Sequence, residues 1–174
     1  MDPVLIRPAT ADDLDGLLAL YQELADGSPV KMPSHPGQSR LVLNRILDDP
    51  ARHLHIAVAD AQTVGTADLL IVANLTHRAR PWAVIENVIV TAAARRHGVG
   101  TALLHHLVQI ASSAGCYKVQ LHSGKQRAQA HDLYKKVGFR PVAEGFKLYF
   151  DGTEQPPDQP SSSPGREEDI RRTA

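Results

Sequence analysis

Apolar residues along the chain follow two spacings, one typical of strands and one typical of helices. A short apolar run over residues 4–7 predicts a first strand. Thr10 and Asp13 then form a pattern like a capping box, which predicts the start of a helix. Apolar side chains follow at helical spacing at Leu14, Leu17, Leu18 and Tyr21. The chain therefore begins with a strand and an amphipathic helix.

The next part of the chain predicts a loop, a second helix and a hairpin. Residues 26–37 hold two Gly and three Pro, a composition typical of a loop. Residues 38–47 predict a helix, which ends at the run Asp48-Asp49-Pro50. Apolar strands over 53–59 and 64–73 flank a short polar turn, so we expect an antiparallel hairpin.

Strands and helices continue to alternate in the second half of the chain. Residues 82–90 predict a strongly apolar strand, and residues 98–114 a long helix that ends at Gly115. A strand over 117–122 and a helix over 126–137, closed by Gly138, follow. Residues 142–150 predict a last strand or hairpin. This alternation indicates an α/β fold.

Composition divides the 174 residues into a domain over 1–150 and a tail over 151–174. The tail holds four Pro, a run of three Ser and no aromatic residue, which predicts disorder. The single cysteine, Cys116, excludes an intramolecular disulfide. We find no signal peptide and no apolar run long enough to span a membrane, so we expect a cytoplasmic protein. A net charge of zero argues against a nucleic-acid partner.

The segment from Glu86 to Thr101 carries the most chemical information. It predicts a strand, a short loop with Gly98 and Gly100, and the start of a helix. The first N–H groups of a helix lack intrahelical partners and favour an anion such as a diphosphate. The Walker pattern is absent, and Leu103 stands where the dinucleotide fingerprint requires a third Gly. The sequence thus predicts a diphosphate site of another kind.

This segment resembles the acetyl-CoA signature of the GCN5-related N-acetyltransferases (GNAT), Arg/Gln-x-x-Gly-x-Gly/Ala. Arg95, Gly98 and Gly100 fill the pattern. The similarity continues in residues 115–121 and 133–139, the latter like the family's xYxKxGF helix end. Within the family, residues 85–88 and 115–118 look like those of glucosamine-6-phosphate N-acetyltransferases and small bacterial members. The resemblance implies a GNAT-type, mostly antiparallel mixed sheet with helices on both faces.

The resemblance also implies acetyl-CoA as co-substrate and a set of residues that hold it. Strand 88–90 would pair its backbone with the pantetheine arm, in a slot made by a splay from strand 117–122. The N–H of Val90 would face the thioester oxygen and stabilise its developing charge. The implied cofactor-binding residues are Val88, Ile89, Val90, Arg95, Arg96, His97, Gly98, Val99, Gly100 and Thr101.

Two side chains are candidates for catalysis. An ammonium cannot attack a thioester, so Glu86 would take its proton as general base, with a solvated carboxylate as the simpler interpretation. Tyr134 would assist the leaving thiolate as general acid, with a core aromatic residue as its alternative. The implied reaction is direct attack of an amine, without an acyl-enzyme.

The remaining polar residues give weaker indications. The acceptor site would lie near the first helix, the 26–37 loop and the hairpin, where Tyr21, Lys31, His35 and Arg40 are candidates. Many relatives carry an Asn before the Tyr, but residues 126–130 hold none, so Lys125 or Arg127 would replace that contact. The nine His show no metal-ligand spacing, and we predict no metal. Cys116 lies outside any nucleophile motif.

The sequence therefore predicts an N-acetyltransferase that acts on a primary amine of a small molecule. One alternative changes the acceptor to a protein or an aminoacyl-tRNA. A second alternative is a CoA-binding module without catalysis, and a nucleotide-dependent oxidoreductase is a distant third. Relatives of this kind are often dimers, which leaves a homodimer open.

Overall fold

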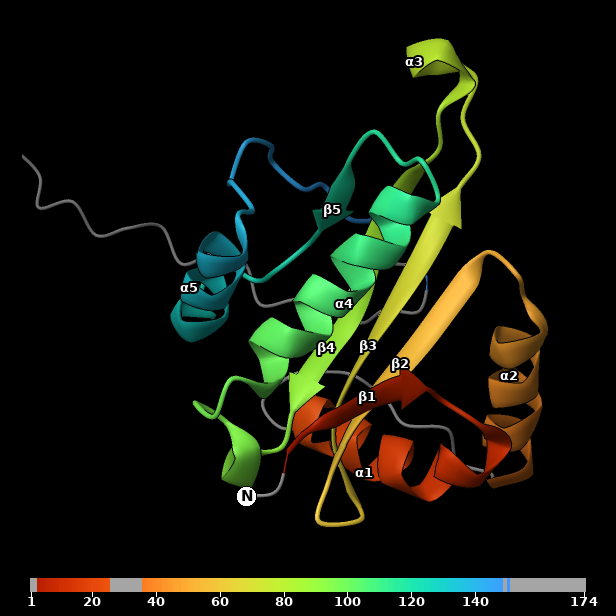
Figure 1. Cartoon of the computed structure of the whole chain (residues 1–174), viewed down its shortest axis with the longest axis vertical. Coiled ribbons are helices and arrows are strands. Elements are labelled where there is room, and N and C mark those ends of the chain that lie inside the picture. The colour runs from red at the N-terminus through yellow and green to blue at the C-terminus, as the bar shows by residue number, and fades with distance from the viewer. Residues whose placement is uncertain (1–2, 26–35, 149, 151–174) are drawn as a thin grey trace, which may run out of the picture.

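The computed structural model describes residues 3–25, 36–148 and 150. Within them one sheet has the strand order β1-β2-β3-β4-β5 (Figure 1). The strands are β1 Leu5–Pro8, β2 Arg52–Ala59, β3 Gln62–Val72, β4 Trp82–Val90 and β5 Val119–Leu121. Neighbours run antiparallel except β4 and β5, which are parallel. The predicted mixed, mostly antiparallel sheet is confirmed.

Helices cover both faces of this sheet. The long helices are α1 Leu14–Ala25, α2 Pro36–Asp48, α4 Val99–Ser113 and α5 Ala128–Val137. Helix α1 contacts β3 and β4, and α2 contacts β2, whereas α4 crosses β2, β3 and β4 and supports α5. A short turn, α3 Thr76–Ala79, stands away from the body of the domain between β3 and β4 (Figure 1). The predicted layers are confirmed.

Strand β2 shows how the sequence pattern builds the two layers. Leu54 and Ile56 share one buried cluster with Leu17 of α1. Ala57 faces the other side, where it packs with Leu103 of α4. Since a one-residue slip would exchange these faces, the alternation fixes the register of the strand. Each fully buried Leu or Ile stabilises the fold by roughly 2 kcal/mol relative to an exposed side chain.

The start of α1 confirms the capping-box pattern. The Thr10 N–H donates to Asp13 Oδ2 at 2.7 Å, and one 3₁₀ turn, Ala11–Asp13, leads into the helix. Arg7 donates to both oxygens of the Asp13 carboxylate, at 2.8 and 2.7 Å. Hydrogen bonding from Arg7, more than any other cause, lowers the pKa of Asp13 from 3.8 to about 2. The first strand and the first helix are therefore joined by a charged clasp.

Two local predictions were wrong. Residues 142–148 form no strand, since no described strand pairs with them, and Phe146 is 91% exposed. An apolar pattern forms a strand only where a neighbouring strand offers hydrogen-bond partners. β5 has just three residues and offers few of them. Gly37 lies in α2 rather than in a loop, because Pro36 suits the first helical position. The rest of the predicted loop, residues 26–35, and the predicted tail lie outside the described residues.

Among the described residues, no helix combines the length and the apolar character needed to cross a membrane.

We expect Asp13→Ala to lower the free energy of unfolding by about 2 kcal/mol at neutral pH. The folded-state pKa of Asp13 is depressed, so its contribution is present above the unfolded pKa near 4 and is lost as pH falls through about 2. Urea unfolding at pH 7 and pH 2.5 should therefore show a smaller difference from the parent protein at the lower pH. Asp12→Ala, an exposed neighbour in the same turn, should change little, and an equal loss there would contradict the clasp.

Candidate active site

The sheet opens between β4 and β5. Pairing of β5 with β4 covers Ala83, Val84 and Ile85 and ends where Ile85 faces Leu121. On the other side of β4, the register shifts between the pairs Asp68–Glu86 and Thr66–Ile89, which places one extra residue on β4. Beyond Ile85, no strand of the described residues pairs with the side of β4 over residues 86–90, and we call this side the open edge.

A positive φ of 54° marks Asn87 as the bulged residue. Asn tolerates the left-handed region better than most residues, because its short polar side chain fits there. The extra residue also breaks the strict alternation of the strand. Val88 packs into the core cluster below α4, whereas Glu86 is exposed. The bulge thus separates the two in orientation although they are close in sequence.

Backbone directions show what the open edge offers. The Thr91 N–H donates to the Val64 carbonyl, at 2.9 Å, so Thr91 points toward β3. Because backbone groups alternate along a strand, Val90 and Val88 point the opposite way, toward the open edge. Arg95 Nε donates to the Val90 carbonyl at 3.0 Å, in agreement with this direction. Ile89 points its backbone toward β3, and its side chain is buried.

The loop over residues 91–98 leads from the open edge to the first turn of α4. Gly98 is the N-cap, with φ of 83°, and Arg96 before it has φ of 65°. The Ala102 N–H donates to the Gly98 carbonyl, at 2.9 Å. As this bond opens the helical ladder, the N–H groups of residues 99–101 have no carbonyl one turn before them. The exposed side chains of Arg96, a cation, and His97 lie just before these groups in the chain.

Gly100 brings α4 close to α5. A Cβ at this position would lie 3.0 Å from Leu133 Cδ2 and 3.6 Å from Val90 Cγ2. The absence of a side chain therefore lets α5 and the end of β4 approach the helix start. Val99, by contrast, is 1% exposed and anchors the turn in the core. Among the predicted motif residues, Gly100 thus allows close packing and Val99 holds the turn in the core, while the backbone of residues 99–101 offers N–H donors.

The Arg95 side chain contacts α1 and the end of β4. Its Nη2 lies 3.6 Å from Glu23 Oε2 on α1, while its Nε holds the Val90 carbonyl. Glu23 was not predicted from the sequence, because 72 positions in the chain separate it from Arg95 and no local pattern links them.

The candidate base and acid lie near the same end of the open edge. Glu86 is 52% exposed, and its Oε1 lies 3.9 Å from His122 Nδ1 on the residue after β5. Tyr134 of α5 packs against the core cluster and meets Phe139 edge-on, with ring centroids 6.3 Å apart. Burial raises the pKa of Tyr134, Arg127 opposes this, and the charge of Glu86 adds to it. The phenol therefore stays protonated, as a donor must be.

A polar cluster lies on the face of the sheet toward α1, where the predicted candidate Tyr21 is joined by Arg52 and Asp68, which were not predicted from the sequence. Arg52 donates to the carboxylate of Asp68, Nε to Oδ2 at 2.9 Å, and Asp68 is 4% exposed. Burial raises the pKa of Tyr21 to about 12, and the charge of Asp68 also contributes. Asp68 stands opposite Glu86 in the ladder, so the cluster adjoins the candidate base.

The other candidates have plainer surroundings. Arg40 is exposed on α2, and Lys31 and His35 lie outside the described residues. Arg127 caps the start of α5, and Lys125 lies in the turn just before it. Burial raises the pKa of the Cys116 thiol, which disfavours a nucleophilic thiolate. In the described part of the chain, no three metal-ligating side chains gather in one place.

Comparison with known proteins places this architecture. A family model described as Acetyltransferase (GNAT) family matches residues 17–139, which include β4, the loop and α4. The chain belongs to this family. The predicted family and the predicted class of acetyltransferase are confirmed.

Three similar proteins illustrate the GNAT relationship. Glucosamine 6-phosphate N-acetyltransferase of Trypanosoma brucei brucei is 40% identical over 85 residues, which are 49% of this chain and 56% of that protein. Glucosamine 6-phosphate N-acetyltransferase 1 of Oryza sativa subsp. japonica is 28% identical over 149 residues, 83% of this chain and 86% of that protein. A solved structure of a putative acetyltransferase from Agrobacterium tumefaciens is 36% identical with a TM-score of 0.77, and the match covers 84% of this chain and 99% of that one.

Gly98→Ala should weaken binding of coenzyme A about tenfold, because a side chain at this left-handed φ costs about 1–2 kcal/mol and shifts the first turn of α4. Isothermal titration calorimetry measures the change. Gly115→Ala is the matched control, since Gly115 has φ of 76° at the other end of α4. It should lower the unfolding temperature similarly and leave binding unchanged. Equal weakening by both variants would show that the effect is not local to the loop.

Proposed function

We propose that this protein is an N-acetyltransferase that moves the acetyl group of acetyl-CoA to a primary amine of a small molecule. One observation carries the proposal. The open edge of β4 is followed, after the 91–98 loop, by the first turn of α4. Membership of the GNAT family supports the same conclusion. The arrangement offers strand-like backbone groups for an amide-bearing arm and helix N–H groups for a diphosphate.

The residues present fit coenzyme A along its length. Val88 and Val90 turn their backbone groups outward, as pairing with a pantetheine arm requires. The N–H groups of residues 99–101, with Arg96 and His97 beside them, suit the two phosphates. The N–H of Val90 would donate to the thioester oxygen as negative charge develops there. Removal of such a donor typically costs about 3 kcal/mol of transition-state stabilisation.

Proton transfer completes the proposed reaction. Glu86 accepts a proton from the bound ammonium, directly or through water, and leaves a neutral amine. The amine nitrogen forms a bond to the acetyl carbon, the carbon–sulfur bond breaks, and the nitrogen gives up its second proton to solvent, which leaves a neutral amide. Tyr134 donates a hydrogen bond or a proton to the departing thiolate. Since both side chains flank the end of the open edge, positioning of the reactants supplies a large share of the acceleration.

The two glucosamine 6-phosphate N-acetyltransferases named above support a small acceptor over a protein or an aminoacyl-tRNA. Their names specify glucosamine 6-phosphate, which pairs a primary amine with a phosphate. We extend this class, a small amine, to the present chain as a proposal. A single acetyltransferase domain over residues 1–150, a cytoplasmic location, a homodimer and the absence of a nucleic-acid partner stay predictions of the same proposal.

Release of free thiol from acetyl-CoA in the presence of a panel of small amines tests the proposal. Glucosamine 6-phosphate and glucosamine form an informative pair, because they share the amine and differ in the phosphate. We expect at least one small amine in the panel to raise thiol release well above the amine-free rate. Binding of acetyl-CoA without turnover for every amine would instead indicate a CoA-binding module, and transfer to added protein alone would indicate a protein acetyltransferase.

Tyr134→Phe should lower kcat about 100-fold, in the range typical of a lost general acid, with an unchanged Kd for coenzyme A. The phenol is lost while the ring that packs on Phe139 remains, so the fold should be preserved. Tyr117→Phe is the control, because Tyr117 stacks on His77 at the far end of β4 and should not affect kcat. Equal kcat in Tyr134→Phe and the parent enzyme would remove Tyr134 from the mechanism.

A further inference from the structure

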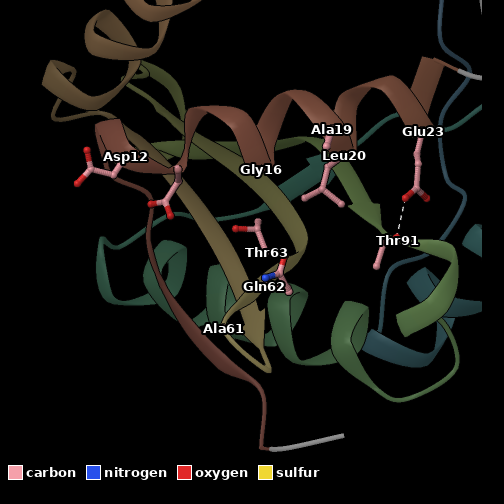
Figure 2. Close-up of a pocket in the computed structure, with 10 residues that line it drawn as sticks. Asp12, Gly16, Ala19, Leu20, Glu23, Ala61, Gln62, Thr63 and Thr91 are labelled. Atoms are coloured by element: carbon pink, nitrogen blue, oxygen red, sulfur yellow. Dashed lines mark hydrogen bonds between the residues drawn. The ribbon is translucent and has the colours of Figure 1, made fainter.

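Glu23, in the last turn of α1, reaches across to the first residues of the 91–98 loop. Its Oε1 accepts a hydrogen bond from the Thr91 hydroxyl at 2.6 Å, which Figure 2 shows as a dashed line. Its Oε2 accepts a hydrogen bond from the Ala92 N–H at 3.0 Å and lies 3.6 Å from Arg95 Nη2. One carboxylate thus accepts two hydrogen bonds and forms one ion pair within a stretch of five residues.

These donors lie at both ends of one turn. The 3₁₀ turn η2 comprises Ala92–Ala94, with Thr91 before it and Arg95 after it. Glu23 contacts both flanks, so it fixes the direction in which the chain leaves β4. Arg95 extends the same network to the open edge, because its Nε holds the Val90 carbonyl. The path from Val90 to Gly98 is therefore anchored by a residue of α1.

An ordinary helix cap would not explain this arrangement. A side chain that caps a turn usually comes from the residue just before that turn. Here the cap comes from 69 positions earlier in the chain, on a helix of the opposite layer. Its contacts tie α1, which also carries Tyr21 at the polar cluster, to the loop that leads into α4. The anchor thereby links two parts of the site rather than one turn alone.

We propose that Glu23 is a positioning residue for the co-substrate, acting through Thr91, Ala92 and Arg95 on the N–H groups at the start of α4. The inference rests on the proposed function, since it assumes that coenzyme A binds at this loop. Glu23 does not touch the co-substrate in this proposal. It holds the backbone that does.

The sign of the effect separates this role from simple electrostatics. A carboxylate near a diphosphate repels it, so removal of the charge alone should tighten binding of coenzyme A. Loss of the anchor should weaken binding, because the loop must then be ordered at the expense of binding free energy. The two explanations therefore predict opposite changes in the dissociation constant.

The surroundings of Glu23 leave space for other side chains at this position. Glu23 and Thr91 both line a hollow of about 370 Å³ between α1 and the turn that joins β2 to β3 (Figure 2). A smaller or neutral side chain meets no crowded wall there. Substitutions at Glu23 should accordingly leave the protein folded, with an unfolding temperature lowered by several degrees because its hydrogen bonds to the loop are lost.

Calorimetric titration of coenzyme A into Glu23→Gln and Glu23→Ala tests the inference. We expect both variants to bind about tenfold more weakly, since hydrogen bonds to a charged group are stronger than those between neutral groups. Asp15→Asn is the matched control, because it removes an exposed carboxylate from the same helix and should leave the Kd unchanged. Hydrogen exchange should rise over residues 91–98 in the Glu23 variants and not in the control.

Thr91 provides an independent check on the same contact. Thr91→Val removes the donor at 2.6 Å and should weaken binding severalfold, whereas Thr91→Ser keeps the hydroxyl and should restore it. Unchanged or tighter binding in the Glu23 variants would overturn the positioning role while leaving the proposed function intact. Failure of the parent protein to bind coenzyme A would overturn both proposals together.

Discussion

The structure depends on the point at which β4 parts from β5. Backbone pairing between parallel strands is continuous in most sheets, yet here it ends at Ile85 and Leu121. The bulge at Asn87 on the other side of β4 places one extra residue in the strand and shifts its register against β3. As a result, a central strand carries backbone donors and acceptors that no strand of the described chain uses. Each candidate role assigned to β4 follows from this break.

The same strand also positions the first turn of α4. Val99 is anchored in the core, and Gly100 allows the turn to lie against Val90 and Leu133. The network of Glu23, Thr91 and Arg95 controls the path between the strand and this turn. The turn proposed to bind the phosphates and the adjoining strand edge are thus held as one unit by contacts from α1, α4 and α5.

Much of the fold was predictable, because its signals are local. Thr10 and Asp13 form the cap that their spacing indicates, and β4 has the bounds that its apolar run gave. The glycine motif and the order of elements were sufficient to predict the family. The strand predicted over 142–150 is absent from the described residues 142–148, since an apolar alternation gives a preference for pairing and does not supply a partner.

The long-range parts of the site could not be predicted. Glu23 meets Thr91, and Arg52 meets Asp68, only after the sheet has formed, and neither pair has a sequence signature. The bulge at Asn87 was also hidden, because a strand with one extra residue keeps nearly the same apolar pattern. The sequence therefore indicated which residue types the chemistry requires, while the tertiary contacts decided how they are held.

The open edge has a consequence for the protein before any ligand arrives. Unpaired backbone groups on a strand invite pairing with another chain, and natural sheets shield such edges. Here the occupant that would cover residues 86–90 is a small molecule rather than a strand. The pantetheine arm would take the place of a neighbouring strand. Because coenzyme A would bind the folded state only, it would shift the folding equilibrium toward that state. The concentration of coenzyme A in the cell would then govern the lifetime of the folded enzyme as well as its rate of turnover.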